Sequence, residues 1–207
     1  MARPSARERL LDCAELLFAE RGLRGASLRA INAEAGLSPA ALHYHFGTQQ
    51  ALVEALLERR MPALMARRAE LLDALDAAAA KGEPPTARAV LATLVRPMAE
   101  LLRDHGEAGL RYLRLVSRLH AEGDLDHAWV IGRHPGGVER LGPLMRAALP
   151  ELPEPLLMLR AKWAIDVLLF SLAQGPAAFG EGLDQYVSAL LDFVTGAMAA
   201  PITGGSV

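Results

Sequence analysis

The segment SLRAINAEAGLSPAALHYHF, Ser27–Phe46, decides the fold expected for this 207-residue chain. It contains two short helical patterns separated by Gly36. Glycine readily adopts the left-handed conformation that ends a helix, so the first helix is expected to end there. Ser27 is placed as the N-cap of the first helix. Ser38, with Pro39 at the first helical position, is placed as the N-cap of the second. Two helices bent around a short glycine turn form a helix-turn-helix, whose second helix can enter the major groove of DNA.

The outer face of the second helix favours DNA over an ordinary helical corner. Leu42 and Phe46 lie four residues apart and face inward. The opposite side carries small and ring-bearing residues, in place of the Glu, Lys and Arg typical of a solvated face: Ala40, Ala41, His43, Tyr44 and His45. Small residues permit close approach, and the ring groups can donate hydrogen bonds to phosphates or base edges.

Three consecutive elements resemble a known family. ARERLLDCAELLFAERG (6–22), the helix-turn-helix and HYHFGTQQALVEALLERR (43–60) are similar to the N-terminal domain of the TetR family of bacterial repressors. The resemblance implies an all-α chain, with a three-helix DNA-binding domain at 1–50 and a larger helical domain at 51–207 that dimerises and binds an effector. It also implies a ligand-responsive transcriptional regulator, most often a homodimeric repressor that a small amphipathic or hydrophobic effector releases from a pseudo-palindromic double-stranded DNA operator.

The resemblance assigns DNA contacts to ten positions: Ser27, Arg29, Ser38, Pro39, Ala40, Ala41, His43, Tyr44, His45 and Gln49. Gln49 stands where the family usually has a lysine that grips a phosphate, and the recognition helix carries no Lys or Arg. We therefore predict few ionic contacts and a shallow salt dependence. Arg3, Arg7 and Arg9 form an N-terminal arm that either reaches the DNA or is a flexible charged end, and the residues alone leave both open.

Composition bounds the remaining possibilities. The hydrophobic share of 52% and the mean hydropathy of +0.18 indicate apolar surface that is buried against a partner, while only 5% aromatic residues disfavour a β-rich fold. The single cysteine, Cys13, fits a reducing compartment. The chain opens without a secretory signal, and apolar runs such as Val167–Ala173 are too short to span a bilayer. We expect a cytoplasmic protein without a membrane partner.

Helical periodicity predicts the elements of the larger domain. A helix that starts at Thr48 can reach Ala80, with Pro62 either kinking or breaking it. Further helices are expected at 86–103, 107–121, 138–149, 154–173 and 182–199, with an irregular stretch at 123–135. The last two helices are the best candidates for a four-helix dimer interface, which the resemblance favours. The alternative is that they are core helices of one subunit. The interface candidates are Leu156, Leu159, Trp163, Val167, Tyr186, Leu190 and Phe193.

The effector candidates are apolar residues and a few polar groups of the larger domain: Met61, Met65, Met98, Arg111, Tyr112, Leu115, Arg118, Trp129, Trp163, Asp166 and Phe170. Arg111, Arg114 and Arg118 form a row beside His120 that could hold a carboxylate or phosphate, although a solvated helix face is the alternative. Asp166 lies within an apolar helix. It is either paired with an arginine, part of a dimer contact, or an anchor for the ligand.

Other classes of protein have weaker support. The sequence has no glycine-rich phosphate loop, G-x-S-x-G or H-E-x-x-H, so we expect neither an enzyme nor a cofactor. His43 and His45 are two residues apart on a helix and cannot jointly chelate a metal. We predict no metal site, but His127 and His134 keep a metal-responsive regulator as an alternative. A helical dimer module that does not bind DNA is the other alternative.

Overall fold

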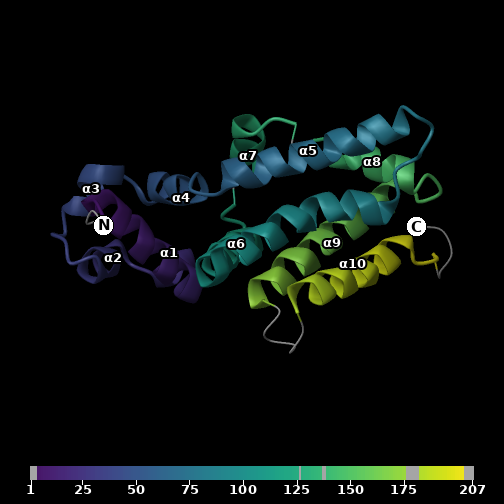
Figure 1. Cartoon of the computed structure of the whole chain (residues 1–207). Helices are drawn as coiled ribbons and strands as arrows, with labels where there is room; N and C mark the ends of the chain where they lie inside the picture. The colour runs from purple at the N-terminus through teal and green to yellow at the C-terminus, as the bar shows by residue number, and fades with distance from the viewer. Residues whose placement is uncertain (1–3, 126, 137–138, 176–181, 203–207) are drawn as a thin grey trace.

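A computed structural model describes residues 4–125, 127–136, 139–175 and 182–202, and the regular structure in these ranges is α-helical. The helices are α1 (Ala6–Gly25), α2 (Leu28–Glu34), α3 (Ala41–Phe46), α4 (Gln49–Leu57), α5 (Met61–Ala79), α6 (Ala87–Glu122), α7 (His127–Arg133), α8 (Leu141–Ala148), α9 (Glu154–Gln174) and α10 (Leu183–Ala199). Helices α1–α3 gather at one end of the molecule, which we call the head, and α5–α10 form the body (Figure 1). The predicted all-α fold is confirmed.

The head is built on the apolar stripe of α1. Leu10, Leu17 and Phe18 lie on one side of this helix and are at most 4% exposed, as are Ile31 of α2 and Leu42 of α3. Each such buried side chain contributes roughly 1.5–3 kcal/mol to folding. Helices α2, α3 and α4 all pack on α1, so this helix fixes where the helix-turn-helix sits.

Four helices, α1, α2, α4 and α6, begin at a residue whose hydroxyl side chain caps them. Ser5 Oγ accepts a hydrogen bond from the Glu8 amide at 3.1 Å, and Thr48 Oγ1 accepts one from the Ala51 amide at 3.1 Å. The Thr86 hydroxyl does the same for α6. These caps satisfy amides that have no partner inside their helices, and they confirm the starts predicted at Ser27, Thr48 and residue 86.

Pro62 begins a new helix. Helix α4 ends at Leu57 and α5 starts at Met61, so Pro62 lies in the first turn of α5. A proline there loses no helical hydrogen bond. The chain therefore changes direction at residues 58–60, between head and body, which settles the question that the sequence left open.

Helix α6 consists of two segments that meet at Gly106. This glycine has φ 50° and ψ −124°, outside the helical region. Beyond it, Gly109 packs against the end of the first segment, where an added Cβ would lie 2.6 Å from the Leu101 carbonyl oxygen. The two segments correspond to the two helices predicted at 86–103 and 107–121.

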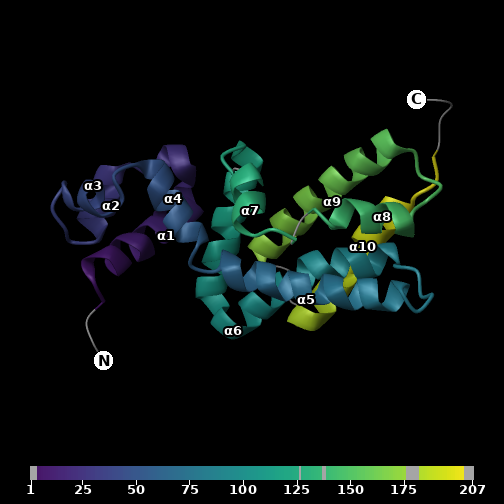
Figure 2. The ribbon, with the colours of Figure 1, turned by 90° about the horizontal axis from the view of Figure 1, so that it is seen from above.

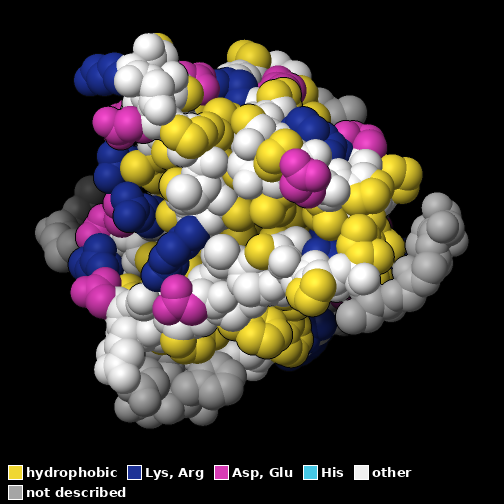
Figure 3. All heavy atoms as spheres, turned by 90° about the vertical axis from the view of Figure 1, so that its right-hand side faces the viewer, with side chains coloured by type: hydrophobic (Ala, Val, Ile, Leu, Met, Phe, Trp, Pro, Cys, Tyr) yellow, Lys and Arg dark blue, Asp and Glu magenta, His cyan; other side chains and the backbone are white. Residues whose placement is uncertain are grey.

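The body packs α5, α9 and α10 around α6, with head and body side by side (Figure 2). The irregular stretch predicted at 123–135 is wrong in part, because α7 occupies His127–Arg133. Apolar side chains are exposed on the end of the body away from the head, with charged groups mainly along one side (Figure 3). Among the described residues, no helix has the length and apolar character needed to cross a bilayer.

Candidate nucleic-acid interface and effector cavity

The turn between α2 and α3 is held by Asn32, which the sequence reading missed. Asn32 is 3% exposed. Its Oδ1 accepts a hydrogen bond from the Leu42 amide at 3.1 Å, and its Nδ2 donates to the carbonyls of Leu28 and Pro39. The cap predicted for Ser38 is wrong, because α3 starts at Ala41 and no side chain of its own N-terminus caps it. The Leu42 amide in its first turn donates instead to Asn32 of α2. A polar residue inside the short apolar pattern of α2 was the available signal.

Most of the predicted DNA contacts are exposed in the helix-turn-helix of the head. Ser27 caps α2 through its hydroxyl, and Arg29 is exposed in the first turn of that helix. Tyr44 is 85% exposed, which is unusual for so large an aromatic side chain. Six further candidates are exposed or half-buried: Ser38, Pro39, Ala40, Ala41, His43 and His45. Nine of the ten candidates are therefore accessible on the two helices and the turn, and their contact with DNA stays a prediction.

Gln49, Arg7 and Arg9 lie within the packed head. Gln49 Nε2 donates a hydrogen bond to the Leu23 carbonyl at 3.1 Å, so this side chain joins α4 to the end of α1. Arg7 lies in the first turn of α1, paired with Glu8, and its guanidinium sits 5.3 Å from the centre of the Phe46 ring. Arg9 also belongs to α1, and Arg3 lies outside the described residues. Arg7 and Arg9 are therefore helical and do not form a flexible arm, while the DNA contact assigned to Gln49 stays a prediction.

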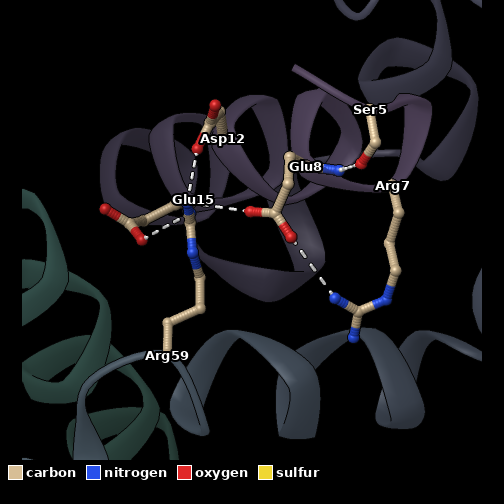
Figure 4. Close-up of polar contacts among 6 residues, drawn as sticks. All are labelled: Ser5, Arg7, Glu8, Asp12, Glu15 and Arg59. Carbon is tan, nitrogen blue, oxygen red and sulfur yellow. Dashed lines mark hydrogen bonds and ion pairs between the residues drawn. The ribbon is translucent and has the colours of Figure 1, made fainter. Parts of the chain in front are cut away.

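Arg59 joins the start of the body to the head (Figure 4). Its guanidinium contacts three carboxylates of α1: Asp12 at 2.7 Å, Glu15 at 3.2 Å and Glu8 at 3.5 Å. The Glu15 side chain is only 4% exposed, and its burial raises the pKa of the carboxyl although the positive charge of Arg59 acts in the opposite direction. The connection between α4 and α5 is therefore fixed to α1 by charge.

The body contains an apolar cavity of about 120 Å³. Its walls come from α5, α6, α7, α8 and α9 and include three methionines that the sequence predicted, Met61, Met65 and Met98. Two ionisable side chains, Arg68 and His120, also line it. A concave apolar site with a few polar groups is the usual form of a small-molecule site. Arg68 was missed, although its spacing places it in the buried stripe of α5 with Met61, Met65 and Leu72.

Several predicted effector residues lie elsewhere. Tyr112 and Leu115 are fully buried in the core, and the Tyr112 hydroxyl donates to the Leu57 carbonyl at 2.9 Å. Trp129 packs at its ring edge against His134, with ring centres 6.5 Å apart. Trp163 and Phe170 are exposed on α9. These side chains satisfy the hydrophobic pattern of their helices without facing the cavity.

The predicted arginine row faces an outer hollow between α1, α6 and α9, which Arg111 also lines. Arg118 donates to the carbonyls of Ala19 and Glu20 in α1, and Arg114 donates to the Ala173 carbonyl near the end of α9. Cationic side chains at the last carbonyls of a helix stabilise its C-terminal end. Arg114 and Arg118 therefore tie helices together, and the row is not in the cavity.

Asp166 is paired, although not with an arginine. His120 Nε2 and Asp166 Oδ1 are 2.7 Å apart, and Lys162 Nζ lies 2.7 Å from Oδ2. Burial opposes the ionisation of Asp166, but the hydrogen bonds from Lys162 and His120 outweigh it and lower the pKa of this carboxyl. The carboxylate thus orients the imidazole that lines the cavity.

The predicted dimer residues divide into two groups. Leu159, Trp163 and Phe193 are 43%, 54% and 66% exposed on α9 and α10. Leu156 and Val167 are half-buried beside them. Tyr186 and Leu190 are instead buried within the chain, because they face the neighbouring helices of the body. They are therefore unavailable to a partner subunit.

The histidines considered for a metal site are separated in the fold. His134 Nε2 lies 3.7 Å from Glu58 Oε1, and His120 is paired with Asp166. His43 Nδ1 is 2.8 Å from the Gly47 carbonyl oxygen. In the ranges that the structure describes, no three His, Cys, Asp or Glu residues are grouped to hold a metal ion. The His127 side chain lies outside the described part.

Two family models match the sequence. The one described as "Bacterial regulatory proteins, tetR family" matches residues 10–56, and the one described as "Tetracyclin repressor-like, C-terminal domain" matches residues 92–200. The first covers the helix-turn-helix, and the second covers the parts of the body formed by most of α6 and by α7–α10.

Curated relatives match about a third of the chain. The repressor KstR2 of Mycobacterium tuberculosis is 38% identical over 69 residues, 33% of this chain and 34% of that protein. UidR of Escherichia coli is 32% identical over 74 residues, 36% of this chain and 37% of that protein. The chain thus matches about a third of the length of these relatives. The solved structure of KstR2 of Mycobacterium tuberculosis shares the fold over 94% of this chain and 95% of its own, with a TM-score of 0.61 and 21% identity.

Proposed function

The chain belongs to the TetR family of bacterial transcriptional regulators, and we propose that it is a homodimeric repressor that a small effector releases from its operator. Residues 1–50 are assigned to DNA binding and 51–207 to effector binding and dimerisation. We propose that it acts in the cytoplasm, where it would meet its DNA operator.

The exposed face of α3 supports DNA binding. Tyr44 is exposed in a head whose other large apolar groups are buried or half-buried, and Arg29 and His43 are exposed as well. Hydroxyl, imidazole and guanidinium donors suit phosphate oxygens and base edges. Two such helices related by a two-fold axis would read half-sites about one DNA turn, ~34 Å, apart.

The exposed apolar groups of α9 and α10 support the dimer. Trp163 and Phe193 line a shallow groove between these helices, and Met158 and Leu159 are exposed along α9. An exposed apolar patch of this kind usually marks a site where another protein binds. Pairing α9 and α10 across a two-fold axis would cover it in both subunits.

The cavity supports an apolar effector. Its lining is aliphatic and thioether-rich, apart from Arg68 and His120. Two solved proteins with this fold are associated with molecules that have large apolar parts. KstR2 is a ketosteroid transcriptional regulator, and the structure of FadR from Bacillus subtilis is a complex with stearoyl-CoA.

The single observation that carries the proposal of release is the connection at residues 57–61. Leu57 is held by Tyr112 of α6, Glu58 by Arg133 of α7, and Arg59 by α1, while Met61 lines the cavity. A molecule that displaces Met61 or its neighbours acts on the segment that fixes the head. Differential affinity for two positions of this segment would couple effector to DNA.

The test is to recover the operator and then release it. The full-length protein is incubated at low salt with fragments of its source genome, including DNA beside its own gene, and bound fragments are sequenced. We expect a pseudo-palindromic site bound by a dimer. If no fragment is retained above a scrambled duplex of equal length, the proposed function is wrong.

A further inference from the structure

Arg68 is a buried cation in an apolar wall. It lies on α5, is 4% exposed, and lines the cavity among methionine, leucine and valine side chains. Its Nε donates to the Thr93 carbonyl at 3.4 Å, close to the limit for a hydrogen bond. Nη1 lies 3.6 Å from the Met65 sulfur, a weak acceptor. These two contacts leave most of its five N–H groups without a strong acceptor.

The neighbouring Arg67 shows what Arg68 lacks. Arg67 faces outward and contacts the carboxylates of Glu70 and Glu100, at 2.8 and 3.0 Å. No ion pair joins Arg68 to an Asp or Glu in the described part of the chain, and burial alone lowers the pKa of its guanidinium, to about 10. It is therefore still a cation at neutral pH. A buried guanidinium without a counter-ion is unfavourable, and leucine at this position would continue the apolar stripe.

We propose that Arg68 supplies the counter-charge for an anionic effector, and that this effector is a small monocarboxylate with an apolar body. This assignment rests on the proposed function, because it names the molecule that the cavity takes. The planar guanidinium presents parallel donors that match the two oxygens of a carboxylate. The aliphatic and methionine side chains that form most of the cavity wall match the hydrocarbon body of such an effector.

The cavity favours a monoanion of modest size. The second ionisable group on its wall, His120, is already hydrogen-bonded to Asp166. Among the described lining residues, Arg68 is therefore the one cation without an opposite charge beside it. A phosphate dianion would need more positive charge than that. An apolar cavity of roughly 150 Å³ holds a benzene ring, so about 120 Å³ suits a body of about six carbon atoms. Rotation of Met61, Met65 and Met98 would admit a longer chain.

Calorimetry on the full-length dimer tests the assignment with defined probes. Benzoate, hexanoate and octanoate are titrated at pH 7, with octan-1-ol and octylamine as probes of equal apolar length. We expect at least one carboxylate to bind about tenfold or more tightly than the alcohol, and the amine to be weakest. Arg68→Leu should weaken carboxylate binding by about 10- to 100-fold while leaving alcohol binding unchanged or stronger.

Arg67→Leu is the matched control, because it removes the same charge one residue away and outside the cavity; it should bind the carboxylates as the wild type does. Equal affinity for octanoate and octan-1-ol in the wild type would overturn the assignment without any variant, as would failure of all three carboxylates to bind at millimolar concentration. An intact operator complex in that same sample would show that the regulator function stands while the assignment fails.

Discussion

Asn32 of α2 accepts the Leu42 amide hydrogen bond of α3 at 3.1 Å, so one helix of the DNA-reading pair caps the other. The turn between them is thereby fixed by a buried side chain as well as by backbone geometry. The angle at which Tyr44 is presented depends on this contact.

Asn32→Ala should destabilise the protein by about 1–3 kcal/mol, because it leaves the Leu42 amide and the Pro39 carbonyl without their partner. Urea denaturation measures this change. Asn32→Asp keeps the acceptor for Leu42 and should lose less, and Glu34→Ala on the exposed side of α2 is the control. A stability change for Asn32→Ala no larger than that of Glu34→Ala would refute the capping role.

Arg59→Gln should destabilise the protein in a pH-dependent way. Removing Arg59 leaves Glu15 buried without its cation, which at neutral pH costs about 3–5 kcal/mol for a buried pair. Burial raises the pKa of Glu15 in the folded state, so the folded state of the variant binds a proton more tightly than the unfolded chain does. The variant should therefore be least impaired near pH 4 and lose stability as the pH rises through the folded pKa of Glu15.

The measurement is urea denaturation of wild type and Arg59→Gln from pH 4 to pH 8. Adding Glu15→Gln to the variant should recover much of the loss at pH 8, because the buried charge is then absent. A deficit that is equal at all pH values, or that the second change does not relieve, would show that the cluster of Arg59 with α1 is not held by charge.

Trp163→Glu or Phe193→Glu should convert the dimer to a monomer, because each places a charge on the exposed apolar face of α9 and α10. Light scattering after size-exclusion chromatography reports the mass in solution. Ala66→Glu, on the exposed side of α5, is the control and should stay dimeric. Dimers in all three variants would place the interface on another face.

Operator binding should depend weakly on salt. The described recognition helix carries no Lys or Arg, and Gln49 is directed to the Leu23 carbonyl, so the ionic contacts per dimer are few. We expect the slope of log K against log salt to be shallower than about −8. Titrations between 50 and 200 mM salt measure it, and a slope of about −8 or steeper contradicts the assigned contacts.

The helices could be predicted from the sequence where the signal is local. Ser5, Thr48 and Thr86 each cap an amide three residues ahead, and the apolar stripe of α1 repeats at helical spacing, so short windows of sequence suffice. The all-α fold and the outer surface of the head follow from such patterns.

The details that depend on distant partners could not be predicted in this way. Asn32 caps a helix ten residues away, and Arg68 contacts a carbonyl 25 residues away. Whether an apolar residue of α9 or α10 faces the core or a partner depends on the packing of the whole body, which is why Tyr186 was assigned to the interface and is buried. Long-range packing decides these roles, and periodicity alone carries no information on it.

The most direct test of the central claim, that the face of α3 reads DNA, is the affinity for the recovered operator measured by fluorescence anisotropy for wild type and His43→Ala/Tyr44→Ala. Both replaced side chains are exposed, so the fold should be retained. Because a specific contact contributes about 1–3 kcal/mol, the variant should bind about 10-fold or more weakly, while Lys81→Ala on the body binds as the wild type does. Wild-type affinity in the double variant would contradict the account.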